Sequence, residues 1–286
     1  MKAAPFRYAR PASIAEACAA LAEHGSDAKL IAGGQSLVPM MAMRLARPAW
    51  LIDIGRIAEL QRIEIGEDFV SLGAGVKQRT VERHAELRER LPLLMKALAW
   101  VGHPQTRNRG TVGGSIVHAD PAAEIPLVAC ALDAVLELRD AAGTCGMPAR
   151  EFFLAPMVSA ITPAQCLVAV RFPVWNASRI GSAFEEVSIR QGDFALASAC
   201  AQIALDDGGR VQRATLGVGG AAPIPQALPA VAELLLGHAP EHLLLEKVAA
   251  AAAEAIEPEG DLHAPAEYRR ELARVLTRRV LERATR

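Results

Sequence analysis

Two Gly-Gly pairs, each followed at once by a polar residue and an apolar run, constrain this chain more than any other feature of its sequence. The first lies in AGGQS at residues 32–36 and the second in TVGGS at residues 111–115. Glycine has no Cβ atom, so its backbone can approach a ligand closely and can point successive N–H groups at phosphate oxygens. Each pair is therefore either a tight turn or part of a site for an anionic ligand.

Together the two loops contain the groups that a diphosphate requires. Gly33 and Gly34 permit close approach, and Ser36 stands where a helix-like segment begins, so its hydroxyl and the free amides of that first turn can bind an anion. The second loop contains the same kinds of group, two glycines and two hydroxyls: Gly113, Gly114, Thr111 and Ser115. Taken singly, a Gly-Gly pair after a strand is most often an ordinary turn. The chain contains neither G-x-G-x-x-G nor G-x-x-x-x-G-K-[ST], which disfavours a Rossmann site and a P-loop.

The composition narrows the possible function classes. The 286 residues carry a formal net charge of −1, which gives no general attraction to nucleic acid or acidic lipid. The N-terminus lacks the apolar core of a secretory signal, and the Ala-rich stretch at 248–260 is too short to span a bilayer. The five cysteines are far apart and form no C-x-x-C pair, so neither an iron–sulfur cluster nor a structural zinc ion is expected. These features favour a cytoplasmic protein with no nucleic-acid partner, no membrane insertion and no bound metal.

Hydrophobic periodicity and turn signals divide the chain into three units, residues 1–56, 57–175 and 176–286. In the first unit, a capping box that begins at Ser13 predicts a helix, and a strand, a short helix and a second strand follow it. This order predicts a small βαβ-like unit around the first Gly-Gly pair.

The second and third units have their own signals. In the second, Thr80 is expected to cap one helix and Pro121 to open another. In the third, alternating apolar residues on both sides of DDGG predict an antiparallel hairpin, and three helices follow it. The last helix carries seven arginines between residues 269 and 286. We interpret them as a solvated face, with docking of an acidic partner as the alternative.

Four stretches resemble the flavoprotein, or medium, subunit of the molybdenum hydroxylases. AGGQS at 32–36 and TVGGSIVHADPAAEIP at 111–126 are similar to the medium chains of carbon monoxide dehydrogenase and to the flavin region of xanthine dehydrogenases. RQGDFALASA at 190–199 and DLHAPAEYRRELA at 261–273 are also similar to this family. Because the four stretches occur in the family's order and span nearly the whole chain, they are far more specific than either loop alone.

The resemblance implies an α+β fold. Two subdomains of the vanillyl-alcohol oxidase (PCMH-like) type hold an extended FAD, and a C-terminal domain with an antiparallel sheet and helices follows them. On this interpretation residues 1–56 are FAD-binding subdomain 1, residues 57–175 are subdomain 2, and residues 176–286 are the C-terminal flavoprotein domain.

The resemblance also implies a set of FAD-binding residues. Val101 matches a position that packs near the flavin, although some relatives have an aromatic residue there. Glu124 matches an acid that can accept a hydrogen bond from the cofactor, and it is equally well placed as an acid in the first turn of a helix. Glu185 stands where some relatives carry Lys, so Arg190 is considered as an alternative cation. The implied cofactor-binding residues are Ala32, Gly33, Gly34, Gln35, Ser36, Val101, Thr111, Val112, Gly113, Gly114, Ser115 and Glu124.

The implied function is that of an FAD-carrying electron-transfer subunit with no catalytic side chain and no metal of its own. Substrate is oxidised at a molybdenum cofactor in a large subunit, two [2Fe–2S] clusters in a small subunit relay the electrons, and the non-covalent FAD of this subunit passes them to NAD, oxygen or a quinone-linked carrier. Family members usually form a dimer of three-subunit units. His103, His118 and Asp120 are expected to be structural. The alternatives are a self-contained FAD-dependent oxidoreductase of similar fold and a non-catalytic scaffold.

Overall fold

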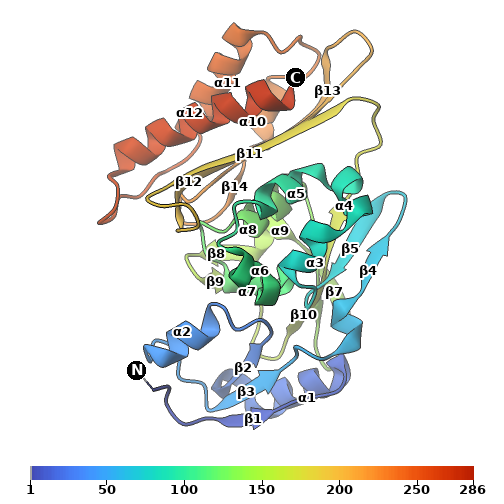
Figure 1. The fold of residues 1–286 in the computed structure, drawn as a ribbon, viewed down its shortest axis with the longest axis vertical. Coiled ribbons are helices and arrows are strands. Elements are labelled where there is room, and N and C mark those ends of the chain that lie inside the picture. The colour runs from blue at the N-terminus through green and yellow to red at the C-terminus, as the bar shows by residue number, and fades with distance from the viewer. Residues whose placement is uncertain (1) are drawn as a thin grey trace.

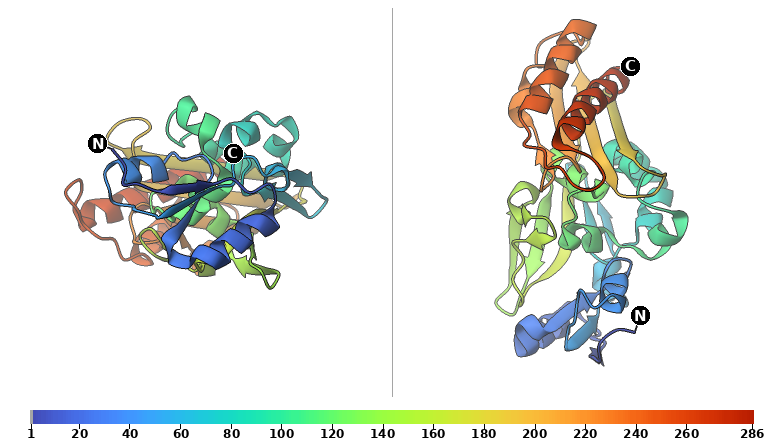
Figure 2. Two further views of the ribbon diagram at one scale, coloured as in Figure 1. Left: turned by 90° about the horizontal axis from the view of Figure 1, so that it is seen from below. Right: turned by 90° about the vertical axis from the view of Figure 1, so that its left-hand side faces the viewer.

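The computed structural model describes residues 2–286 as an elongated molecule whose three main sheets follow one another along the long axis (Figure 1, Figure 2). The N-terminal unit lies at one end, a five-stranded sheet with its helices in the middle, and the C-terminal sheet with its helices at the other end. The predicted α+β class is confirmed. Met1, which the first predicted unit includes, lies outside the described residues.

The N-terminal unit is a three-stranded parallel sheet in the order β1-β3-β2, against which α1 packs. The predicted capping box is present: Ser13 Oγ accepts the N–H of Glu16 at 3.2 Å, and the Glu16 carboxylate accepts the N–H of Ala12 at 2.8 Å. The predicted strand–helix–strand follows, with the first Gly-Gly pair between β2 and α2. The elements are β1 (Arg7–Ala9), α1 (Ile14–His24), β2 (Ala28–Ile31), α2 (Leu37–Ala42) and β3 (Trp50–Asp53).

The middle unit contains an antiparallel sheet in the order β4-β5-β10-β6-β7 and a separate small hairpin, β8-β9. The last strand of the unit in sequence, β10, lies at the centre of the sheet. The predicted hairpin around the DAAG turn is formed by β6 and β7. The strands are β4 (Ile63–Ile65), β5 (Phe69–Gly73), β6 (Val135–Arg139), β7 (Thr144–Pro148), β8 (Phe153–Ala155), β9 (Val158–Ser159) and β10 (Cys166–Pro173).

The middle unit contains the 3-10 helix η2 (Ala58–Gln61) and seven α-helices. Two of the α-helices begin at a residue other than the predicted one. Thr80 lies inside α3, which begins two residues earlier because Lys77 is extended and bridges to Thr111. Pro121 precedes α8, because its carbonyl accepts the N–H of Gly220 at 2.8 Å in a turn outside the helix. The helices are α3 (Gln78–Arg83), α4 (Ala85–Arg90), α5 (Pro92–Leu98), α6 (Pro104–Arg109), α7 (Val112–His118), α8 (Glu124–Ala131) and α9 (Ala149–Phe152).

The C-terminal unit is an antiparallel sheet in the order β11-β12-β13-β14 that lies between two helical layers. Figure 1 shows α12 and α11 on its outer side and α5 and α8 of the middle unit on its inner side. The predicted hairpin around DDGG is formed by β12 and β13. The elements are β11 (Ile180–Ser188), β12 (Ala195–Leu205), β13 (Val211–Gly219), β14 (Gln226–Ala227), α10 (Pro229–Glu233), α11 (His242–Glu254) and α12 (Ala266–Ala284).

Alternate residues of the C-terminal sheet belong to different cores. Ala199 and Ala201 pack into the core beneath α11 and α12, whereas Cys200 between them packs into the large core that also fills the first two units. That larger core extends from Ile14 of α1 through Phe172 of β10 to Ala204 of β12. The division of the chain at residues 56 and 175 stays a prediction.

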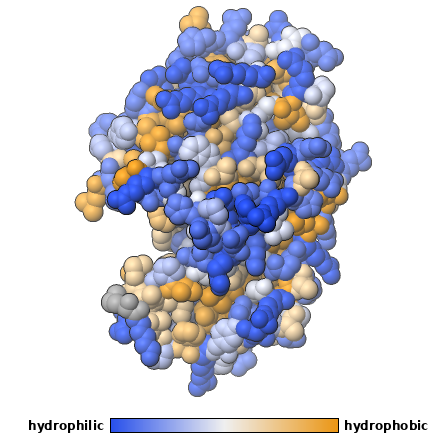
Figure 3. Space-filling model, in the orientation of Figure 1, coloured by the Kyte–Doolittle hydropathy of each residue, from blue (hydrophilic) through white to orange (hydrophobic). Residues whose placement is uncertain are grey.

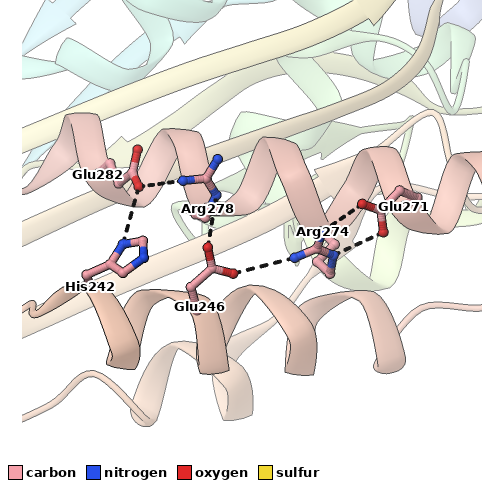
Figure 4. Close-up of polar contacts among 6 residues, drawn as sticks. All are labelled: His242, Glu246, Glu271, Arg274, Arg278 and Glu282. Atoms are coloured by element: carbon pink, nitrogen blue, oxygen red, sulfur yellow. Dashed lines mark hydrogen bonds and ion pairs between the residues drawn. The ribbon is translucent and has the colours of Figure 1, made fainter.

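The arginines of α12 are largely neutralised within the chain (Figure 4). Arg274 and Arg278 both contact Glu246 of α11, and each also pairs with a second carboxylate on α12 itself. Arg269, which the sequence placed on a solvated face, is instead buried and pairs with Asp261 at 2.7 Å. Ion pairs at the protein surface, such as that of Arg274 with Glu271, are worth about 0–1 kcal/mol each. The helix thus offers an acidic partner fewer unpaired cations than its sequence indicates.

Candidate cofactor-binding site

The fold brings the two Gly-Gly loops into contact, although nearly eighty residues separate them in the sequence. A Cβ atom added to Gly33 would lie 2.2 Å from the carbonyl oxygen of Arg109 and 2.9 Å from the Cα of Gly110. The backbone of the first loop therefore presses directly on the residues that precede Thr111. Here the absence of a side chain permits close contact between the loops.

The first loop has backbone N–H groups that are free to bind. Within residues 2–286, none of the N–H groups from Gly33 to Ser36 donates to an acceptor. Gly34 has φ = 71°, in the region that favours glycine. The exposed side chain of Gln35 donates to the carbonyl of Gly33 at 3.1 Å, and the Ser36 hydroxyl is exposed and does not cap α2. Ala32, directly before Gly33 in the sequence, is half-buried.

In the second loop, by contrast, the backbone N–H groups already have acceptors. Thr111 is buried and caps α7, because its Oγ1 accepts the N–H of Gly114 at 3.0 Å. The loop is also held against the segment that follows β5. The other three bonds run from Val112 N to Val76 O at 2.9 Å, from Gly113 N to Ala74 O at 2.9 Å, and from Ser115 N to Thr111 O at 3.2 Å. These N–H groups are thus bonded within the chain, and the prediction that the loop offers its amides to a ligand stays a prediction.

The glycines of the second loop differ in their surroundings. A Cβ atom on Gly113 would lie 2.4 Å from the Cβ of Ala74, so this glycine is required for packing. Gly114 is exposed, and a Cβ atom there would come close only to Thr111 Oγ1, at 2.8 Å. The half-buried Ser115 can contribute its hydroxyl. The second loop thus supplies an exposed backbone surface and a hydroxyl, while the first loop supplies N–H donors.

Two further predicted residues lie on neighbouring segments. Val101 is buried, with 8% of its surface exposed, in the turn between α5 and α6. Glu124 is the first residue of α8 and is half-buried. Burial raises the pKa of Glu124 to about 7, and the charge of Asp120 adds to this rise. Glu124 can therefore be either a hydrogen-bond acceptor or a protonated donor near neutral pH.

Sequence reasoning missed a second acid beside Glu124. Glu186 on β11 is 7% exposed, and burial together with the charge of Glu124 raises its pKa to about 8. Its Oε2 atom is buried without a hydrogen-bond partner among the described residues, as is the hydroxyl of Ser198, its cross-strand neighbour. The only sequence signal for Glu186 was the Glu-Glu pair at residues 185–186. The Glu186 carboxyl on β11 and the Ser198 hydroxyl on β12 are thus two buried polar groups without partners, on neighbouring strands.

Glu185 and Arg190, the two positions considered for a cation near the flavin, have different surroundings. Glu185 forms an ion pair with Arg283 of α12, so it faces the outer layer of helices, whereas Glu186 next to it interacts with Glu124. Arg190 is exposed in the turn between β11 and β12, where its carbonyl accepts the hydroxyl of Ser188 at 2.8 Å. The suggestion that Arg190 supplies a cation beside the flavin, because Glu185 stands where some relatives carry Lys, stays a prediction.

The three residues expected to be structural have ordinary surroundings. Asp120 is buried and accepts the N–H of Ala122 at 2.9 Å, which forms the turn before α8. His118 is the last residue of α7, and the exposed His103 precedes α6. Gly192 of the β11–β12 turn lies against His103, since a Cβ atom there would be 2.7 Å from the imidazole. This contact brings the C-terminal unit over the Val101 turn.

The molecular surface is indented near the N-terminal unit. Figure 3 shows the molecule hollowed on the left, between the N-terminal unit and the rest, with apolar side chains gathered at its lower edge. A cavity of about 230 Å³ lies elsewhere, between the middle unit and β13, and no loop residue lines it. Within residues 2–286, no cluster of His, Cys, Asp and Glu could hold a metal ion, and no helix has the length and hydropathy to cross a membrane.

These residues fit an extended dinucleotide cofactor. A diphosphate requires several N–H and hydroxyl donors close together, which the first loop and Ser115 provide. A planar ring system with amide-like edges requires an apolar wall and a hydrogen-bonding partner, which Val101 and Glu124 provide. The fold and the site thus fit the class of dinucleotide-binding α+β proteins, with the two loops in contact at the site.

Comparisons with known proteins place the chain in a family. Residues 4–175 match the family described as FAD binding domain in molybdopterin dehydrogenase, and residues 182–284 match that described as CO dehydrogenase flavoprotein C-terminal domain. The 6-hydroxypseudooxynicotine dehydrogenase complex subunit alpha of Paenarthrobacter nicotinovorans is 36% identical over 99% of this chain and 96% of its own length. The carbon monoxide dehydrogenase medium chain of Hydrogenophaga pseudoflava is 36% identical over 98% of this chain and 96% of its own length.

A solved structure agrees with this placement. The crystal structure of quinoline 2-oxidoreductase from Pseudomonas putida 86 is similar to this chain with a TM-score of 0.93 and 33% identity, over 100% of this chain and 98% of the matched one. The chain therefore belongs to the FAD-binding medium subunits of the molybdenum hydroxylases. It is an oxidoreductase subunit whose cofactor is FAD, and the resemblance seen in its sequence is confirmed.

Proposed function

We propose that this chain is the electron-transfer subunit of a molybdenum-dependent hydroxylase and that the two Gly-Gly loops form its FAD cradle. The single observation that supports the cradle is the packing of Gly33 on Arg109 and Gly110, which places free amides of one loop beside the exposed backbone of the other. The residues of the proposed site are Ala32, Gly33, Gly34, Gln35, Ser36, Val101, Thr111, Val112, Gly113, Gly114, Ser115 and Glu124.

The proposed roles follow from the groups that remain available. The N–H groups from Gly33 to Ser36, with the Ser36 and Ser115 hydroxyls, bind the diphosphate. Val101 excludes water beside the ring system, and Glu124 holds or releases a proton at its carboxyl group toward the ring edge. Flavin, when bound, takes up and releases electrons singly or in pairs. No side chain of this chain is assigned acid–base chemistry on a substrate.

The electron route is part of the same proposal. Electrons reach this subunit from [2Fe–2S] clusters of a small subunit, after substrate oxidation at a molybdenum cofactor in a large subunit, and leave to a terminal acceptor. The relatives are named for a nicotine derivative, carbon monoxide and quinoline, although each is 33–36% identical to this chain. Such uniform similarity supports a role that does not depend on the substrate. The proposal includes a cytoplasmic complex, arranged as a dimer of heterotrimers.

The proposed domain organisation assigns residues 1–56 and 57–175 to two FAD-binding subdomains and residues 176–286 to the C-terminal domain. The family matches at 4–175 and 182–284 support a division near residue 176. The continuous core shared by α1 and the middle sheet supports joint folding of the first two subdomains.

The experiment is purification of the complex through a tag on this chain. We expect FAD in a one-to-one ratio with the tagged chain, and molybdenum and iron in two co-purifying polypeptides. A complex or chain without FAD, even after incubation with the cofactor, would contradict the proposal. Substrate turnover by the tagged chain alone would support the self-contained oxidoreductase instead.

A further inference from the structure

A buried arginine next to the proposed site has an unusually complete set of partners. Arg107 on α6 is 7% exposed, and its Nη1 donates to the carbonyl of Val101 at 2.9 Å and to that of Gly102 at 3.1 Å. Its Nε and Nη2 donate to the two carboxylate oxygens of Glu82 on α3, each at 3.2 Å. The Arg107 guanidinium thus connects α6 to the Val101 turn and to α3.

The helix that carries Arg107 lies between two parts of the proposed site. The α6 helix is only six residues long, with the Val101 turn directly before it and Gly110 and Thr111 directly after it. The first Gly-Gly loop rests on the end of α6, where Gly33 meets the carbonyl of Arg109. Any rotation or shift of α6 would therefore move both the apolar wall of the site and the surface on which the first loop rests.

We propose that the buried Arg107–Glu82 pair is a positioning element of the FAD site, which fixes α6 and so sets the Val101 turn relative to the two Gly-Gly loops. This inference rests on the proposed function, because it assigns the pair a role in cofactor binding.

The chemistry of the pair suits positioning better than stabilisation. A buried ion pair adds little net stability compared with apolar residues of similar size, because both charges lose their hydration. Its planar two-pronged contact does, however, fix direction as well as distance. Burial alone would raise the pKa of Glu82, but its hydrogen bonds to Arg107 and Arg79 lower it, so the carboxylate stays ionised. The pair is thus a fixed contact rather than one that titrates near neutral pH.

The chain contains a matched control for this pair. Arg269 on α12 is 6% exposed, donates to the carbonyls of Leu196 and Gly220 at 2.6 and 2.8 Å, and pairs with Asp261 at 2.7 Å. It has the same kinds of partner as Arg107, two carbonyls and one carboxylate. It bonds to no residue of either Gly-Gly loop or of the Val101 turn. A purely structural role of Arg107 predicts the same consequences at both positions.

The experiment compares Arg107→Lys and Glu82→Gln with Arg269→Lys in the tagged complex. The measurements are FAD affinity, from flavin fluorescence during titration of flavin-free protein, the visible circular dichroism of bound flavin, and Tm without FAD. We expect all three variants to lower Tm. Only Arg107→Lys and Glu82→Gln should alter the dichroism and weaken FAD binding, by about tenfold or more, in analogy to the outer-shell partners that orient metal ligands.

The outcomes separate the inference from the proposed function. If both substitutions at the pair lower Tm but leave FAD affinity and dichroism as in the wild type, the positioning role is wrong and the proposed function stands. If the wild-type complex binds no FAD, the proposed function fails and the inference with it. If Arg107→Lys does not fold, Glu82→Gln decides, since it keeps the size of the side chain and one acceptor oxygen.

Discussion

The two Gly-Gly loops share a sequence pattern, but their backbone amides have different partners. In the loop at 32–36 the N–H groups from Gly33 to Ser36 have no acceptor within the described chain. In the loop at 111–115 the N–H groups of all four residues after Thr111 have acceptors. Those of Val112 and Gly113 bond to the segment between β5 and α3, and those of Gly114 and Ser115 bond to Thr111. The same residue types therefore differ in what they leave available: the first loop has N–H groups without acceptors, and the second is a rigid surface beside it.

The difference teaches that a glycine pair does not by itself indicate a phosphate contact. Gly33 and Gly113 both have neighbours so close that any side chain would collide with backbone or with Ala74. Their role is to let protein segments meet, which is a packing role. Gly34 is special for its backbone conformation, and Gly114 for its exposure. Each glycine can thus be tested for a separate consequence.

The largest effect is expected from Gly33→Ala. Its new methyl group would meet the Arg109 carbonyl at 2.2 Å, and because that atom is backbone the two loops must separate. We expect a destabilisation of about 1–3 kcal/mol and loss of most of the bound FAD. Urea unfolding and the flavin content of the purified complex measure both. Gly208→Ala in the β12–β13 turn is the control. A Gly33 variant with the same stability and FAD content as this control would contradict the close contact between the loops.

The next effect sharpens the contrast between the loops. In Gly34→Ala a side chain must adopt φ = 71°, which costs about 1–2 kcal/mol, and relief of this strain rotates the free amides. We expect FAD affinity to fall by roughly tenfold, since 1.4 kcal/mol corresponds to that factor. Gly114→Ala, whose amide is already bonded to Thr111, should weaken binding less. Titration of both variants with FAD tests this, and equal losses would show that the two loops are equivalent.

A smaller effect is expected from the helix cap of the second loop. Thr111→Val removes the oxygen that accepts the Gly114 N–H, which should cost about 1 kcal/mol in the free energy of unfolding. Thr111→Ser keeps the oxygen and should restore most of it. Denaturant unfolding of the flavin-free protein gives both values. Unchanged stability in the Val variant would mean that the amide is not held as described.

The last prediction is a pH-dependent effect at Glu186, a buried acid of β11. Burial raises the pKa of Glu186 from 4.5 to about 8, so the folded chain keeps a proton that the unfolded chain releases above about pH 4.5. This contribution to stability is complete below pH 4.5 and is lost as the pH rises toward about 8. We expect Glu186→Gln to flatten the fall of stability between pH 5 and pH 8, measured by urea unfolding. The same slope in variant and wild type would show that Glu186 is ionised in the fold.

Much of the fold could be predicted because its signals are local. The capping box at Ser13 and the hairpin around DDGG depend on residues a few positions apart, and both are present. The starts predicted at Thr80 and Pro121 were wrong for a non-local reason. Lys77 is held extended by its bridge to Thr111, and Pro121 is held in a turn by Gly220, a hundred residues away.

Non-local contacts also limited how much of the candidate site could be predicted from the sequence. The two loops were found from their composition, yet Arg107 and Glu186 were not. Arginine on a short polar helix resembles a surface residue, and only the tertiary structure buries it against Glu82 and two carbonyls. Glu186 follows Glu185 in sequence, but the alternation of a strand turns one toward Arg283 and the other toward Glu124.

The sequence alone determined that this chain is a medium flavin subunit of the molybdenum hydroxylases, because four motifs occur in one order along its length. It also determined which segments could form a cradle. Only the tertiary structure decided which amides remain free, which glycines serve packing and which buried charges support the site. The reason is physical: a residue type limits what a group can bind, but whether that group is still available depends on the neighbours that folding brings to it.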